Sequence, residues 1–316
     1  MIFAESPLRD AYRLVVWGPA RHALGGLPAG WELALHRRMG LAAAVAARGQ
    51  RARVERNLRR AFPGREDVPA IARATFGTHF QHQYLPVSFP RITAKNADRY
   101  LRIVGLDHVD RALALGRGVV LVHPHMGPVQ LPLHVMGVLG YPVHQVGGGV
   151  VEGLSRVGEW AAGVRRGLEA AMPVTVHDGK GYLRPVLRAL SSNSVVMATC
   201  DGTGGGAELG RRVVRTVLGQ PMKLPVSPLW LALRAGAPLL PLTTFASGGR
   251  HPRHVTEIGA PFDLPRGMPF DEGLARGADL LAAFLSEVLA LHPADWHFWD
   301  HFEPGRFLGA SGEEDA

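Results

Sequence analysis

The chain contains very little cysteine and very little lysine. Cys200 is the single cysteine among 316 residues, which excludes an internal disulfide framework and a zinc site built from cysteines. We therefore expect a reducing compartment, and we interpret Cys200 as a small residue at a strand end, with a nucleophilic role as the alternative. Lys95, Lys180 and Lys223 are the only lysines, so arginine carries nearly all of the positive charge.

The excess of arginine gives the chain a formal net charge of +8. Arginine binds phosphate groups through paired hydrogen bonds, so this charge favours an anionic partner. A phospholipid surface, a phosphopantetheine carrier and nucleic acid all fit that description, and a general preference of the genome for arginine is the alternative. The sequence has no zinc-finger or RNA-recognition signature, so we expect no nucleic-acid partner.

The sequence also lacks a run of about 18 uncharged apolar residues, so we expect no conventional transmembrane helix. Residues 11–47 instead mix apolar side chains with arginines. This pattern predicts a helical hairpin that lies on a bilayer surface, with a helical cap packed on the core as the alternative. Trp17 and Trp31 are candidates for a bilayer interface.

Hydrophobic periodicity changes near residue 100. Before it, helical spacing and Pro-Gly stops predict helices at residues 33–46, 51–62 and 70–83. After it, short β-branched runs alternate with helical segments. The expected strands are residues 102–104, 119–122, 143–146, 174–176, 195–199 and 239–245, with an antiparallel edge strand at 255–258 and a long helix at 273–291. The alternation predicts an α/β fold: a mixed, largely parallel central sheet flanked by helices, with an N-terminal helical region.

We divide the chain into three regions on this basis. Residues 1–99 form a helical region at a membrane surface, and residues 100–308 form the α/β core. Residues 309–316 are small and acidic, and we expect them to be a disordered tail.

The strand at 119–122 ends in two histidines and a glycine, His123, His125 and Gly127. The carboxyl end of a buried strand is where α/β enzymes place their chemistry. A histidine in such a loop can act as a general base, because its ordinary pKa lies near neutral pH. Two alternatives remain open: His125 merely satisfies loop backbone groups, or His123 and His125 hold a metal in a metallohydrolase, although no acidic third ligand follows nearby.

Several short motifs follow one another in the order of a known family. They are Arg53-Val54, Asn57-Leu58, Phe62-Pro63, Val104-Gly105-Leu106, Gly116-Arg117-Gly118-Val119-Val120, His125-x-Gly127, Asp201, Leu218-Gly219, residues 228–237, Pro241, and Trp296-His297-Phe298-Trp299 with Arg306. Together they resemble the lysophospholipid acyltransferase family, which includes the late acyltransferases of lipid A biosynthesis and the mycobacterial acyltransferases of phosphatidylinositol mannosides. The resemblance covers most of the chain.

The resemblance implies an acyltransferase that works at the cytoplasmic face of the membrane. His125 would take a proton from a hydroxyl or amine of a lipid or glycolipid acceptor, which attacks the thioester of acyl-coenzyme A or of an acyl carrier protein. Amides near Gly127 would stabilise the oxyanion. The resemblance implies no cofactor besides this acyl donor, and no metal.

The chain departs from the family at Gln130, where the family's His-x4-Asp/Glu motif has its acid. An amide oxygen can still accept a hydrogen bond from His125 Nδ1, but it cannot neutralise an imidazolium. Three outcomes follow: another carboxylate substitutes, with Asp201 first and Glu208 next; the acceptor is a more nucleophilic amine; or the protein binds lipid or carrier without catalysis.

Several arginines are candidates for binding an anionic part of the substrate. Arg165 and Arg166 lie where the family has an arginine on a helix facing the site. Arg211, Arg212 and Arg215 follow a glycine-rich loop at residues 202–206, which we expect to be a mobile lid, and they could meet a phosphopantetheine phosphate or a lipid headgroup. A solvated basic face is the alternative. We include His123 among the residues expected near the substrate.

Overall fold

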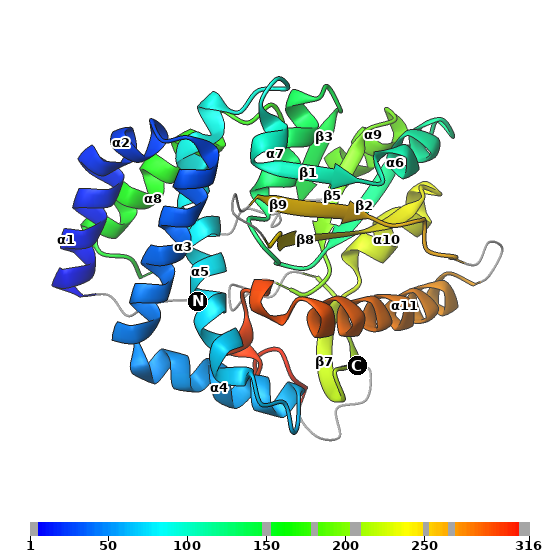
Figure 1. The fold of residues 1–316 in the computed structure, drawn as a ribbon. Coiled ribbons are helices and arrows are strands. Elements are labelled where there is room, and N and C mark those ends of the chain that lie inside the picture. Colours follow the sequence, from blue (N-terminus) through cyan, green and yellow to red (C-terminus); the bar gives the residue numbers. More distant parts are fainter. Residues whose placement is uncertain are drawn as a thin grey trace.

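The computed structural model describes residues 6–146, 153–177, 183–202, 210–248, 253–264 and 269–309 (Figure 1). Its α-helices are α1 (Pro7–Val15), α2 (Arg21–Gly25), α3 (Ala29–Ala46), α4 (Arg48–Ala61), α5 (Val68–Tyr84), α6 (Leu106–Leu113), α7 (Gln130–Val138), α8 (Arg156–Glu169), α9 (Arg184–Ser191), α10 (Ser227–Ala235) and α11 (Phe270–Leu291). A π-helical turn (Val16–Ala20) joins α1 to α2, and 3-10 turns lie at Leu85–Arg91, Ala97–Arg99, Pro293–Asp295 and Trp299–His301. The strands are β1 (Leu101–Val104), β2 (Val119–His123), β3 (Val143–Val146), β4 (Thr175–His177), β5 (Val195–Thr199), β6 (Arg212–Val217), β7 (Gln220–Pro225), β8 (Leu239–Ala246) and β9 (His254–Ile258).

The central sheet has seven strands in the order β1-β9-β8-β2-β5-β3-β4. Every neighbouring pair is parallel except β8 and β9. The predicted α/β fold with a mixed, largely parallel sheet and an N-terminal helical region is therefore confirmed. The prediction of an antiparallel strand at 255–258 is right in direction but wrong in position, because β1 pairs with the outer side of β9 and takes the edge of the sheet.

Helices cover both faces of the sheet (Figure 1). Successive residues of a strand point to opposite faces. Val120 and Val122 accordingly pack in one apolar cluster with residues of α9, α10 and α11, whereas Val119 and Leu121 pack in another with residues of α6 and α7. All four side chains are buried. This continuous apolar run, without polar alternation, is the signature of a strand buried on both faces.

The N-terminal helices form a separate group beside the sheet (Figure 1). Helices α3 and α5 cross so closely that a Cβ atom added to Gly40 would lie 2.3 Å from the carbonyl oxygen of Phe76. Helix α8 joins this group, since Ala161 packs in one cluster with Trp17 and Tyr84. No helix among the described residues combines the length and the apolar character needed to cross a bilayer.

The hairpin of β6 and β7 was not expected from the sequence. Its two strands pair in antiparallel register from Arg212 to Pro225. The turn residues Leu218 and Gly219 both have positive φ angles, as the favoured two-residue hairpin turns require. Leucine seldom adopts this conformation, so its side chain gave no turn signal.

A buried carboxyl group lies under the N-terminal helices. Glu32 on α3 has no exposed surface, and it accepts hydrogen bonds from Ser88 and Arg91. Burial raises the pKa of Glu32 to about 7, although the contacts with Ser88 and Arg91 partly offset this. The folded protein therefore holds a proton on Glu32 at a pH where the unfolded chain does not.

The substitution Glu32→Gln tests this buried carboxyl group. Because the folded-state pKa is raised, the contribution of Glu32 to stability should be fully present below pH 4.5 and be lost as the pH rises through about 7. Relative to the variant, which cannot titrate at this position, we expect the wild type to lose roughly 2–3 kcal/mol between about pH 5 and pH 8. Thermal or urea unfolding across this range measures the difference, and a gap that does not change with pH would refute the assignment.

Candidate functional site

The pairing of β2 with β5 brings His125 and Asp201 together. His123, the last residue of β2, lies opposite Thr199, the last residue of β5. His125 lies two residues after His123, and Asp201 lies two residues after Thr199, so both follow strand ends that are aligned with each other. The Nδ1 atom of His125 is 2.7 Å from Oδ1 of Asp201, and the backbone amide of His125 donates to Oδ2 at 2.7 Å. The two residues that the sequence proposed as base and charge partner thus make direct contact.

Asp201 is fully buried, and the indole N–H of Trp296 donates to its Oδ2 atom at 2.8 Å. Burial alone would raise the pKa of Asp201, but the charge and hydrogen bonds of His125, together with the bond from Trp296, outweigh it and lower the pKa. An ionised carboxylate only accepts hydrogen bonds, so Nδ1 of His125 must carry a proton. The neutral imidazole then has its lone pair on Nε2. The His125 side chain is 23% exposed, so the ring has access to ligand or solvent.

The segment after the 3-10 turn Pro293–Asp295 holds the loop that carries His125. The amide of Gly127 donates to the carbonyl of Asp295 at 2.9 Å, and the amide of His297 donates to the carbonyl of His125 at 3.0 Å. The side chain of His297 also bonds to the carbonyl of Gly127, through Nε2. Burial lowers the pKa of His297 to about 3, so this ring is neutral and acts as an N–H donor.

These contacts change the expected role of Gly127. Its amide is already bonded to Asp295, so it is not free to stabilise an oxyanion. Gly127 instead allows a tight turn, with a φ of 58°, that presses against the backbone of Thr244.

Rings from distant parts of the chain surround the loop. The ring centroid of Phe298 lies 4.7 Å from that of His125. His79 and His82 on α5 approach the ring of His297, with centroid distances of 5.6 and 4.7 Å. Burial lowers the pKa of both α5 histidines well below the ordinary value. Neither histidine was expected at the site from the sequence, because a histidine three residues from another on a helix gives no sign of the loop that it faces.

The ring of His123 lies near that of His125, with 6.4 Å between the centroids, but it is not accessible. It is buried, its Nδ1 atom contacts the carbonyl of Pro124 at 3.1 Å, and burial lowers its pKa to about 4. Within the described ranges of the chain, no group of three or more histidine, cysteine or acidic side chains is arranged to hold a metal. The metallohydrolase alternative therefore finds no third ligand there. Cys200 is also buried, and burial raises the pKa of its thiol well above the ordinary value, which disfavours a nucleophilic thiolate.

Gln130, the first residue of α7, does not make the expected contact with His125. Its Nε2 atom donates to Oε1 of Glu169 at 2.8 Å, and its Oε1 atom accepts from Nη2 of Arg165 at 3.1 Å. Nδ1 of His125 is taken by Asp201 instead. The expectation of a weak orienter at position 130 is therefore corrected. Glu169 was not expected at the site from the sequence, although its spacing of four residues from Arg165 on an expected helix indicates a contact between the two.

Three of the other candidate arginines lie on the surface or are bound to acidic side chains of α11, and one lies beside Gly202. Arg166 is exposed on α8, and Arg211 is an exposed side chain 3.8 Å from Asp271. Arg215 is bound to Asp279 of α11 at 2.6 Å. The guanidinium nitrogens of Arg212 lie within 4 Å of a Cβ atom placed on Gly202. Glu208 and most of the glycine-rich loop lie outside the described residues.

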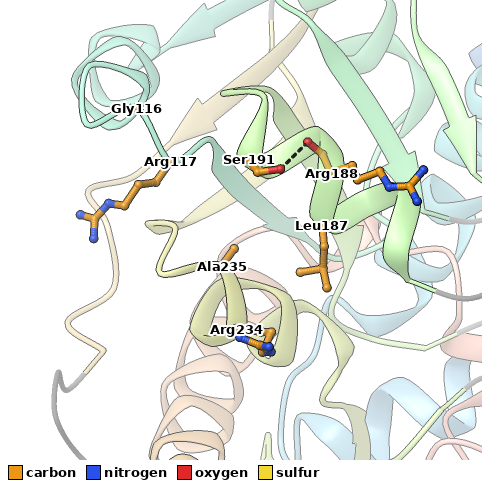
Figure 2. Close-up of a pocket in the computed structure, with 7 residues that line it drawn as sticks. All are labelled: Gly116, Arg117, Leu187, Arg188, Ser191, Arg234 and Ala235. Carbon is orange, nitrogen blue, oxygen red and sulfur yellow. Dashed lines mark hydrogen bonds between the residues drawn. The ribbon is translucent and has the colours of Figure 1, made fainter.

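A hollow of about 480 Å³ lies on the side of the sheet where the strands begin, and His125 lies on the side where they end (Figure 2). Its lining includes Arg117, which precedes β2, and Arg188 and Arg234, near the ends of helices that lead into strands. It therefore lies at the amino ends of the strands, away from His125. Figure 2 shows the three arginine side chains pointing in different directions, so they do not converge on one ligand.

The substitution Gly127→Ala tests the tight turn. The new side chain would occupy a left-handed conformation, and its Cβ would lie 2.9 Å from the carbonyl oxygen of Thr244. We expect a loss of roughly 3 kcal/mol or more of unfolding free energy. Gly140→Ala is the matched control, because Gly140 also has a positive φ but no atom within 4 Å of the added Cβ. It should lose only about 1 kcal/mol. Equal losses in chemical unfolding would show that the Thr244 contact has no effect.

Comparison with known proteins supports the resemblance in the motifs. The family model for bacterial lipid A biosynthesis acyltransferases matches residues 19–301. A phosphatidylinositol mannoside acyltransferase of Mycobacterium tuberculosis (strain ATCC 25618 / H37Rv) is 30% identical over 231 residues, which are 71% of this chain and 66% of that protein. The protein of the same name from strain CDC 1551 / Oshkosh is 29% identical over the same shares, so the match spans just under two thirds of the length of these relatives. The chain belongs to the bacterial lipid A biosynthesis acyltransferase family.

Proposed function

We propose that this protein transfers a fatty acyl group from an acyl thioester to a hydroxyl or amine of a lipid or glycolipid acceptor. One observation carries the proposal. His125 Nδ1 lies 2.7 Å from a buried, ionised Asp201, which leaves Nε2 of a partly exposed imidazole as the proton acceptor. Family membership supports the same reaction class, and the names of the two mycobacterial relatives indicate a phosphoglycolipid acceptor.

The reaction follows from the position of the free nitrogen. Nε2 of His125 takes the proton of the acceptor hydroxyl or amine as its oxygen or nitrogen attacks the thioester carbonyl. Asp201 stabilises the imidazolium that forms. The tetrahedral intermediate then collapses, the carbon–sulfur bond breaks, and the leaving thiolate receives the proton from His125. The donor is acyl-coenzyme A or an acyl carrier protein, so no further cofactor takes part.

Stabilisation of the oxyanion falls to the start of α7. The first amides of a helix have no acceptor within the helix and carry a partial positive charge. Helix α7 begins at Gln130, and in its first turn Pro132 has no N–H while the Leu131 amide bonds to the carbonyl of Pro128. Because the Gly127 amide is occupied by Asp295, we assign this role to the amide of Gln130. Arg165, which contacts Gln130, adds a positive charge beside the same helix end and is suited to a phosphate of the substrate.

Two substitutions test the His125–Asp201 pair. His125→Ala should abolish acyl transfer, and Asp201→Asn should lower kcat on the order of 10³–10⁴-fold, because the amide cannot stabilise an imidazolium. Turnover of radiolabelled acyl-coenzyme A or acyl carrier protein with a mixture of phospholipid and glycolipid acceptors measures both. Asp279→Asn on α11 is the matched control and should retain activity, since Asp279 is a largely exposed partner of Arg215.

Full turnover by the His125→Ala variant would overturn the mechanism. If the wild type binds the acyl donor but transfers nothing to any acceptor, the protein is instead a non-catalytic lipid-binding or carrier-binding relative.

We also propose that α3 docks on an anionic membrane surface, which we place at the cytoplasmic side because that is where both candidate donors occur. Residues of a helix turn by about 100° each, so Trp31, Leu35, Arg38 and Val45 lie on one stripe. The stripe is exposed: Trp31 is 72%, Leu35 37% and Val45 60% accessible. Such side chains enter the interface of a bilayer. The exposed arginines of the neighbouring α4 would meet anionic headgroups; they are Arg48, Arg53, Arg56 and Arg59.

The double substitution Trp31→Ala with Leu35→Ala tests this docking. Because it removes apolar surface that would enter the interface, we expect vesicle binding to weaken about tenfold or more. Sedimentation with vesicles that contain phosphatidylglycerol measures it. Leu139→Ala, an exposed leucine beyond the end of α7, is the control and should leave binding unchanged. Equal binding by all three proteins would contradict the assignment of α3.

A further inference from the structure

One guanidinium group joins three helices beside the start of α7. Arg165 on α8 donates from Nε to Glu169 at 2.6 Å, from Nη1 to Gln83 of α5 at 2.7 Å, and from Nη2 to Gln130 at 3.1 Å. The side chains of Arg165 and Glu169 are 17% and 21% exposed. A guanidinium has five N–H groups, so two have no hydrogen-bond acceptor among the described residues and can serve a ligand.

The Gln130 amide bridges a positive and a negative group. Its Nε2 atom donates to Glu169 and its Oε1 atom accepts from Arg165, which is the only orientation that satisfies both neighbours. A carboxylate at position 130 could not do this. Two carboxylate oxygens would then lie about as far apart as the 2.8 Å between Gln130 and Glu169, and they would repel each other. The carboxylate of Glu169 therefore requires a neutral hydrogen-bond donor, such as an amide, at position 130.

We propose that Glu169 supplies, for Arg165, the negative charge that an acid at position 130 would otherwise place beside it. Glu169 is a positioning residue: it neutralises and orients the guanidinium, Gln130 completes the link, and the two free N–H groups are directed towards a phosphate of the substrate. Gln130 and Glu169 thus form a pair in which α7 carries the neutral amide and α8 the carboxylate. This inference rests on the proposed function, in which Arg165 binds an anionic group.

The geometry favours this role over a simple surface ion pair. An exposed pair four residues apart on a helix contributes little. Here the acceptors come from α5, α7 and α8 and fix the guanidinium plane from three sides. Arginine held in this way binds phosphate with less loss of side-chain freedom, so its effect should appear in substrate binding.

The test is a cycle of three variants: Glu169→Gln, Gln130→Glu and the double variant. Each single variant changes the charge around Arg165, and we expect KM to rise about tenfold with kcat changed less than about threefold. The double variant restores one carboxylate and one amide in exchanged places, so KM should return to within about threefold of the wild-type value. Glu159→Gln, an exposed glutamate on the same helix, is the matched control and should leave both constants unchanged.

The same kinetics identify the source of the phosphate. A rise confined to the KM of the lipid acceptor assigns Arg165 to the headgroup, and a rise confined to the KM of the acyl donor assigns it to the phosphopantetheine part. Inorganic phosphate should compete with whichever substrate is affected, and less strongly in the single variants.

A second measurement requires no turnover. In the Gln130→Glu variant a carboxyl at position 130 faces Glu169, so one of the two should keep its proton at neutral pH and have a raised pKa. The stability of this variant relative to wild type should therefore fall as the pH rises through that pKa, while the double variant follows the wild type. Melting temperatures from about pH 5 to pH 8 record this.

Two results would overturn the inference. In one, the double variant is as impaired as the single variants in KM and in melting temperature. In the other, Glu169→Gln lowers the melting temperature but leaves both KM values unchanged, so that Arg165 only fastens helices. If the wild type shows no acyl transfer, the proposed function fails, whereas the melting temperatures still decide whether the two positions exchange charge.

Discussion

The register between β2 and β5 is the constraint on which the candidate site depends. Parallel pairing aligns the strand ends at His123 and Thr199, so His125 and Asp201, 76 residues apart in the chain, emerge side by side. A slip of one residue would turn alternate side chains to the opposite face and separate the pair. Both strands are buried from two sides, so a slip would disturb the close packing on both faces of the sheet.

Burial of Asp201 concentrates negative charge at this edge of the sheet. A buried carboxylate is tolerated only when its hydrogen bonds are satisfied, and His125 and Trp296 provide three donors. Burial of the neighbouring rings of His123 and His297 lowers their pKa, and this effect outweighs the charge of Asp201, which acts in the opposite direction. The segment around Trp296 therefore serves two purposes, since it supplies a donor to Asp201 and fastens the loop of His125 through Asp295 and His297.

The N-terminal helices take part in the site as well as in the proposed membrane contact. Helix α5 brings His79 and His82 towards the loop of His125, and its Gln83 accepts a hydrogen bond from Arg165. Helix α8 follows the first strands in sequence, yet it packs among these N-terminal helices. Arg165, which would meet the substrate, is thus held by residues of α5, α7 and α8.

The sequence by itself determined the fold class, because strand and helix periodicities report directly which side chains face a core. It also singled out His125 and Asp201, since each follows an apolar β-branched run that must end at the same edge of a parallel sheet. The partners of Gln130, the occupied amide of Gly127 and the approach of His79 and His82 were decided only by the tertiary structure. These contacts join helices and loops far apart in the chain. Their geometry depends on how the helices pack, and no local pattern of residues records it.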